Sequence, residues 1–272
     1  MLRPKYCFFE SVIAEYWRMD REEHDRWLIA ARRTIELDRR SKTSLLVASE
    51  DTVRFRSMYP IARHALAQVG AALTLHDTGR SFEASANARV ALEHALLAQW
   101  IVLTADSETL LANSIDKSHS LILRGLEPFA QSIPADLRPL LVLPTAARVP
   151  PMDQICGRFD RTGLLYTMYR GLTGAVHLSG ASVAEYVSVN GETGAIVLHP
   201  KPRSRMPPTD FEKALGWAAV LAKAALEMLL DDDSDLVEVA AIARNAGLPH
   251  DLTFDDRYPE RQPQNHPQSG NM

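Results

Sequence analysis

The clearest regularity in the chain is the helical spacing of apolar residues in its last third. After Pro208, apolar side chains recur at intervals of three and four, so they fall on one face of a helix. Thr209 stands three residues before Glu212, the spacing of a capping box in which two side chains bond the free amides of a helix start. The pattern predicts a helix over about 209–231 and, after the acidic run 231–233, a further helix near 234–245.

Similar periodicity predicts several helices before this segment, and together they indicate a bundle. Pro60 suits the first turn of a helix over about 60–79, which Gly79 would close. Further helices are expected over about 20–41, 81–104, 107–130 and 160–178. The helix over 81–104 is apolar nearly all round beyond Val90, so we expect it at the centre of the bundle.

One short β-hairpin interrupts the helices. Strand-forming residues on either side of Asn190 and Gly191 predict a hairpin near 186–198, so the expected fold class is mainly α, a helical bundle with one short β-hairpin. The proline-rich connection over 134–151 retains apolar residues and is expected to pack on the bundle. We divide the chain into an N-terminal helical extension (1–50), a helical bundle domain (51–256) and a tail (257–272) whose composition predicts disorder.

Composition narrows the class of protein without selecting an activity. The 272 residues are 46% hydrophobic and 24% charged, which excludes a disordered or collagen-like chain, and the net charge of -4 gives no global attraction to nucleic acid. Cys7 and Cys156 form neither a disulfide framework nor a paired zinc motif. No signal peptide is visible, and the longest apolar run, 90–103, is too short and polar to span a bilayer. We expect a cytoplasmic protein with no metal ion or other cofactor.

Candidate chemistry is confined to a few polar side chains on predicted helices. The sequence contains no glycine-rich phosphate loop, no HExxH and no GxSxG motif. Arg170 and His177 are seven residues apart, so a regular helix would place both on one face, about 10 Å apart along its axis. Arg89 and Glu93 are four residues apart and can form an ion pair within one helix.

The spacing of Arg170 and His177 resembles the Arg-x(4–6)-His motif of the HEPN (higher eukaryotes and prokaryotes nucleotide-binding) superfamily. Over roughly residues 55–230 the chain is also similar to a bacterial helical family of unknown function, in which an Arg-x3-Glu helix precedes a Tyr–Ser/Thr–His helix. The residues that match this second pattern are Arg89, Glu93, Tyr169, Thr173 and His177. The resemblance implies an RNA-directed protein, a metal-independent ribonuclease of stress or defence, which forms a homodimer.

The resemblance also implies a role for each residue. His177 would be the general acid or base on a ribose hydroxyl, a task that suits an imidazole because its pKa lies near neutral pH. Arg170 would clamp the phosphate through its planar fork of donors and stabilise the developing charge. These two catalytic residues must be exposed together in a cleft, and Thr173 would orient the imidazole. The supporting or pocket-lining residues are Thr173, Tyr169, Arg89 and Glu93.

A structural interpretation of the same residues stays open. Gly171 occupies a position that is often polar in active members, and it could simply let a neighbouring helix approach closely. His177 would then bond the last carbonyls of its helix, while Arg89 and Glu93 would form an internal ion pair that fixes helix register. The chain would be a non-catalytic helical interaction or dimerisation module for a protein partner, or a bundle with a small-ligand pocket at Arg89 and Glu93.

Overall fold

The fold class predicted from the sequence is confirmed: the chain is mainly α-helical, with one short antiparallel hairpin. The computed structural model describes residues 21–40, 46–126, 134, 145–177, 180–202, 210–230, 234–250 and 252–254. The elements are α2 (Arg21–Arg40), η1 (Ser49–Asp51), α3 (Thr52–Asp77), α4 (Ser81–Leu103), α5 (Ser107–Leu126), α6 (Met152–Phe159), α7 (Leu164–Val176), α8 (Gly180–Tyr186), β1 (Val187–Val189), β2 (Ile196–Leu198), α9 (Phe211–Glu227) and α10 (Ser234–Ala246). The predicted disordered tail lies outside the described residues.

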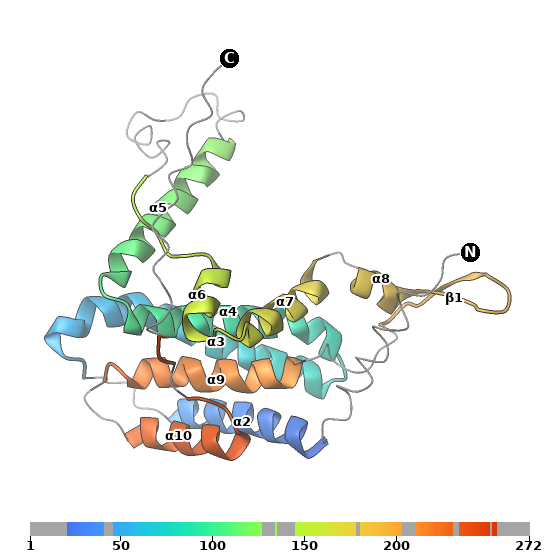
Figure 1. Cartoon of the computed structure of the whole chain (residues 1–272), viewed down its shortest axis with the longest axis horizontal. Coiled ribbons are helices and arrows are strands. Elements are labelled where there is room, and N and C mark those ends of the chain that lie inside the picture. The colour runs from blue at the N-terminus through green and yellow to red at the C-terminus, as the bar shows by residue number, and fades with distance from the viewer. Residues whose placement is uncertain are drawn as a thin grey trace.

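The helices form layers around α9. Figure 1 shows α9 between α3 and α4 on one side and α2 and α10 on the other, with α7 lying against α4. Every residue of α9 except Lys213 is buried, so this helix is enclosed even more completely than α4, the one predicted at the centre. No helix in the described part of the chain is long and apolar enough to cross a membrane.

The N-terminal helix α2 shares the core of the bundle. It packs against α9 and α10, and Trp27 and Leu37 are buried in the same apolar cluster as the central helices. The contact with α9 is very close, because a Cβ atom added at Gly216 would lie 2.7 Å from the backbone oxygen of Trp27. A glycine at this point therefore sets the distance between α2 and α9. The domain boundary at residue 50 stays a prediction.

The start of α9 differs from the predicted capping box. The helix begins at Phe211, and Asp210 rather than Thr209 occupies the N-cap, in a left-handed conformation with φ of 70°. Thr209 itself lies outside the described residues. The Glu212 carboxylate, which the box required to turn back on the helix start, lies 3.4 Å from Nδ1 of His24 in α2. Glu212 therefore joins two helices instead of capping its own.

The prediction that Pro60 opens a helix is wrong. Pro60 lies inside α3, which already begins at Thr52 and continues to Asp77. Proline has no amide hydrogen, so the carbonyl four residues earlier cannot receive the usual helical bond from position 60. The predicted end of the helix is confirmed, because Gly79 follows α3 with φ of 74° and its amide bonds the carbonyl of His76.

The helix predicted over 160–178 is shorter than expected and follows another helix. The chain forms α6, then a turn at 160–163, then α7. The Asp160 carboxylate fixes this break, since it accepts bonds from the amides of Thr162 (2.8 Å) and Leu165 (2.9 Å). Burial alone would raise the pKa of Asp160, but these hydrogen bonds outweigh it and hold the pKa below its usual range. Gly163, with φ of 77°, then starts α7.

The described end of the proline-rich connection lies along α5. Asn113 donates to the carbonyl of Ala147 at 2.8 Å, and the amide of Val149 donates to the hydroxyl of Ser114 at 3.0 Å. Val149 also packs against the apolar core. Residues 145–151 therefore contact the helices as predicted, whereas the apolar run 140–143 lies outside the described residues.

The predicted hairpin is present, and an unpredicted short helix, α8, precedes it. β1 and β2 pair in antiparallel register, with Val187 opposite Leu198 and Val189 opposite Ile196. Figure 1 shows this hairpin extending beyond the end of the bundle. Three of its apolar side chains are largely exposed: Val189 at 65%, Ile196 at 71% and Leu198 at 74%. The hairpin therefore presents apolar surface that the described residues leave uncovered.

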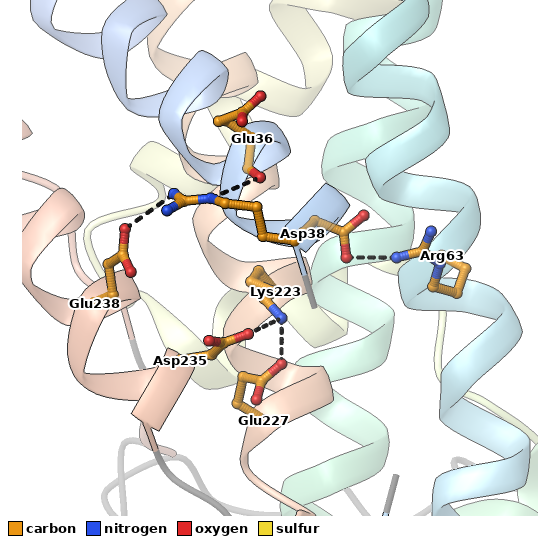
Figure 2. A network of polar contacts seen from close by, with 8 residues as sticks. Glu36, Asp38, Arg63, Lys223, Glu227, Asp235 and Glu238 are labelled. Atoms are coloured by element: carbon orange, nitrogen blue, oxygen red, sulfur yellow. Dashed lines mark hydrogen bonds and ion pairs between the residues drawn. The ribbon is translucent and has the colours of Figure 1, made fainter. Parts of the chain in front are cut away.

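An ion network is buried where α9 meets α10 (Figure 2). Lys223, only 1% exposed, donates to the carboxylates of Glu227, one turn later in α9, and of Asp235 in α10 at 2.9 Å. Close by, Asp38 at the end of α2 pairs with Arg63 of α3. Burying a charge costs free energy unless an opposite charge lies beside it, so the two carboxylates compensate the buried positive charge of Lys223.

Candidate functional site

Four of the six predicted site residues meet between α4 and α7. Arg89 of α4 donates through Nε to Oγ1 of Thr173 at 3.1 Å and through Nη2 to the hydroxyl of Tyr169. The predicted ion pair of Arg89 with Glu93 is present, with Nη2 and Oε2 3.3 Å apart. The Tyr169 hydroxyl donates to the same Glu93 oxygen at 3.3 Å. We call these four residues the Arg89 cluster.

The spacing of residues on the two helices explains this arrangement. Arg89 and Glu93 are four residues apart on α4, as are Tyr169 and Thr173 on α7, so each pair shares one face of its helix. The Arg89 guanidinium also lies over the Tyr169 ring, 4.7 Å from its centroid. The Arg89 cluster therefore holds α7 against α4 at a fixed register.

The Arg89 cluster is half-buried, which strengthens its internal electrostatics. The Arg89 side chain is 19% exposed and that of Glu93 is 33% exposed. Burial and the Glu93 carboxylate raise the pKa of Tyr169, against the opposing effect of Arg89. Tyr169 is therefore a neutral hydrogen-bond donor at physiological pH, and the Arg89–Glu93 pair carries no net charge.

Arg170 and His177 lie outside the Arg89 cluster, and both are exposed. The structure corrects one prediction: α7 ends at Val176, and His177 is its C-cap with extended φ and ψ of -101° and 150°, so it does not continue the helical face of Arg170. The amide of His177 donates to the backbone carbonyl of Thr173 at 3.1 Å. The Thr173 hydroxyl bonds Arg89 and donates to the carbonyl of Tyr169.

The two catalytic candidates are nevertheless accessible from solvent, Arg170 in the middle of α7 and His177 directly after its last residue. Neither side chain is sealed in the core. The ribonuclease hypothesis also required a shared cleft, and the hollows at α2 in the described part of the chain are lined by residues of α2, α3 and α10 instead. The Arg89–Glu93 pair also agrees with the alternative in which an internal ion pair fixes helix register.

A second polar network, on the α3–α4 side, was not predicted as a unit. Nδ1 of His64 in α3 lies 2.7 Å from Nδ1 of His94 in α4. Nε2 of His64 lies 3.0 Å from the Gln68 amide, whose oxygen accepts a bond from Asn87 at 2.7 Å. We call His64 and His94 the histidine pair, and Gln68 and Asn87 its amide relay. The i, i+4 spacing of His64 and Gln68 was visible in the sequence, but the facing of α3 and α4 was not.

Burial and charge set the protonation of this network. Burial and the neighbouring His64 lower the pKa of His94, and Glu93 opposes that effect only in part. His94 is therefore a neutral imidazole at physiological pH. One ring nitrogen of the histidine pair must then donate to the other, since two lone pairs cannot face each other at hydrogen-bond distance.

The described residues contain neither a metal site of three or more ligands nor a reactive thiol. No group of three or more His, Cys, Asp or Glu side chains in the described ranges is arranged to hold a metal ion. The Cys156 thiol is buried, which, with the nearby Asp153 and Asp160, raises its pKa to about 12. Cys156 is therefore a protonated core residue and not a nucleophile.

Comparison with known proteins identifies no relative. The chain matches no protein-family model, and neither the curated proteins nor the solved structures yield a match. The resemblance to HEPN proteins therefore stays a prediction that rests on the residues named above.

Proposed function

We propose that the chain is an RNA-directed protein that cleaves single-stranded RNA without a metal ion, through Arg170 on α7 and His177 directly after the last residue of that helix. The observation that supports this function is the joint exposure of Arg170 and His177 next to the half-buried Arg89 cluster. An imidazole and a guanidinium are the groups that such cleavage needs, one to move a proton and one to bind phosphate.

The cleavage step assigns one task to each exposed side chain. The His177 imidazole takes the proton of a ribose hydroxyl, whose oxygen attacks the adjacent phosphorus. The bond from phosphorus to the leaving ribose oxygen breaks, and that oxygen takes a proton from water, while the hydroxide that remains takes back the proton from His177. A cyclic phosphate and a free hydroxyl end result. Arg170 donates to the phosphate oxygens and stabilises the charge that develops on them.

The Arg89 cluster has a positioning role in this proposal. Arg89 bonds both Tyr169 and Thr173, the residues that flank Arg170 on α7, and so fixes the rotation of α7 about its axis. The His177 amide is tied to the same turn through the carbonyl of Thr173. Without the Arg89 contacts, α7 would be free to rotate against α4. The resulting displacement of Arg170 and His177 would lower the rate of RNA cleavage.

The test is cleavage of fluorescently labelled single-stranded RNA in the presence of EDTA. Wild-type protein should cleave, His177→Ala should lose activity, and Arg170→Ala should lose most of it. His119→Ala, which removes an exposed histidine from α5, is the matched control and should keep full activity. Circular dichroism establishes that each variant is folded. Absence of cleavage by wild-type protein, or equal cleavage by wild type and His177→Ala, would refute the proposal.

A second candidate is a non-catalytic interaction or dimerisation module. The exposed apolar side chains of the hairpin favour it, because Ile196 and Leu198 are more than two-thirds exposed. Leu121 and Ile122 on α5 are also exposed, at 50% and 61%. Analytical ultracentrifugation tests self-association: the module predicts a dimer that Ile196→Ser and Leu198→Ser together dissociate. A monomer at all concentrations would exclude dimerisation through this hairpin.

A further inference from the structure

We propose that the histidine pair, His64 and His94, is a binding site for a divalent transition-metal ion, copper(II) or nickel(II), held by the two Nδ1 atoms. The site lies between α3 and α4 and is independent of the ribonuclease proposal, which uses neither histidine. It is smaller than the three-ligand groups that are absent from the described residues. Its remaining coordination positions face solvent, because His64 is exposed.

The geometry of the two rings is the first argument. Their Nδ1 atoms converge to 2.7 Å, and the ring centroids are 4.7 Å apart. Two nitrogens in neighbouring positions of a square-planar or octahedral ion, each about 2.0 Å from the metal, lie about 2.8 Å apart. Two ligands of a tetrahedral zinc ion lie farther apart, at about 3.3 Å. The rings therefore suit copper(II) or nickel(II) with little adjustment.

The amide relay is the second argument. Metal-binding histidines usually bond a polar partner through their other ring nitrogen, which fixes the orientation of the ring. Nε2 of His64 has such a partner in Gln68, which is held in turn by Asn87. When the amides of Gln68 and Asn87 flip together, the Gln68 oxygen can accept the Nε2 proton that His64 carries once Nδ1 binds metal, and the Asn87 oxygen accepts from the Gln68 nitrogen.

Metal binding requires the Nδ1 atoms of both rings to be free of protons. The proton that one Nδ1 carries in the hydrogen bond between the rings therefore moves to Nε2 of the same ring when the ion binds. Glu93 is next to His94 but its carboxylate bonds Arg89 and Tyr169, so it stays in the Arg89 cluster. Two imidazoles are therefore the protein ligands.

The consequence of metal binding is a cross-link between α3 and α4. His64 and His94 are 30 residues apart in sequence, so an ion that binds both stabilises the folded chain and not the unfolded one. The ion would also restrict α4, the helix that carries Arg89 and Glu93. Bound metal should therefore raise the unfolding temperature, and the rise should grow with the logarithm of the metal concentration above the dissociation constant.

The experiment is titration of the purified protein with CuCl2 and with NiCl2 by calorimetry, at neutral pH in a non-chelating buffer. Wild-type protein should bind one ion of either metal at this site. His64→Ala and His94→Ala should weaken binding by about 10-fold or more, and Gln68→Leu, which removes the relay, by about 10-fold. His119→Ala is the control and should bind as wild type does. Electron paramagnetic resonance of the copper complex should show coupling to two imidazole nitrogens.

Several outcomes would overturn the proposal. One is the absence of binding heat with both ions, and another is equal affinity in wild type, His64→Ala and His94→Ala. A copper spectrum with coupling to fewer than two nitrogens would also overturn it, even if His94→Ala were poorly folded. Cleavage of RNA in EDTA that survives His64→Ala would leave the ribonuclease proposal standing, so the two proposals can fail separately.

Discussion

Replacement of Lys223 by methionine should destabilise the protein by an amount that the buried network allows us to work out. Lys223 is 1% exposed and compensates the charge of Glu227, whose side chain is 6% exposed. Removal of one partner of a buried ion pair leaves an uncompensated charge and costs about 3–5 kcal/mol. Asp235 contributes less to the loss because its side chain, at 29% exposure, retains contact with water.

The pH dependence of Lys223→Met provides a second measurement of the same effect. Burial raises the pKa of Glu227, Lys223 lowers it, and Asp235 and Asp38 raise it. Without Lys223 only the raising influences remain, so the pKa of Glu227 rises further above the 4.5 of an unfolded chain. The folded state then binds a proton that the unfolded state releases. The free energy of unfolding should therefore fall as the pH rises from 4.5 through the pKa of Glu227 in the folded state, and this fall should be steeper than in wild type.

The double variant Lys223→Met/Glu227→Leu is the matched control. It removes both buried charges, so it should recover most of the free energy of unfolding lost in the single variant. Urea unfolding followed by circular dichroism, at mildly acidic and slightly basic pH, measures all three proteins. A loss below about 1 kcal/mol in Lys223→Met, or a double variant no more stable than the single one, would refute the reasoning.

Three further predictions concern stability and reactivity. Gly216→Ala should lower the free energy of unfolding by about 1–3 kcal/mol, measured by thermal unfolding, because the added Cβ would collide with the backbone of α2. Gly70→Ala, whose Cβ would enter open space, should raise it by about 0.5–1 kcal/mol. Asp160→Ala should lower the free energy of unfolding by about 1 kcal/mol, measured by urea unfolding at neutral pH. Because the pKa of Asp160 is lowered in the folded state, this difference should vanish as the pH falls below the usual 3.8 and through the folded pKa. In a Cys7→Ser background, Cys156 should react with a thiol reagent only at the rate of unfolding, and fast labelling of native protein would contradict its burial.

The strength of the local pattern explains which helices the sequence predicted well. The bounds of α4 and α10 agree with the prediction to within one residue, because apolar residues and flanking breaks coincide there. The break between α6 and α7 was missed, since apolar periodicity does not report a side chain that bonds nearby amides. Asp160 followed by Gly163 was the available signal, an acidic residue and a glycine typical of a turn.

Pairing within a helix was predictable, whereas pairing between helices was not. The Arg89–Glu93 pair follows from a spacing of four residues on one helix. The contacts of Arg89 with Tyr169 and Thr173 cross about 80 residues of sequence and depend on how α7 rotates against α4. The histidine pair depends in the same way on the rotation of α3 against α4, so only the folded chain reveals it.

The proline inside α3 has a consequence for how the helix exchanges its amide hydrogens. Pro60 removes one bond of the ladder between a first segment, 52–59, in which only Met58 is buried, and a second segment with six buried residues. Because local opening depends on buried contacts and bonded amides, the first segment can fray while the second stays closed. Hydrogen exchange should therefore divide α3 into two units at Pro60, an outer one that exchanges fast and an inner one that opens only with the core.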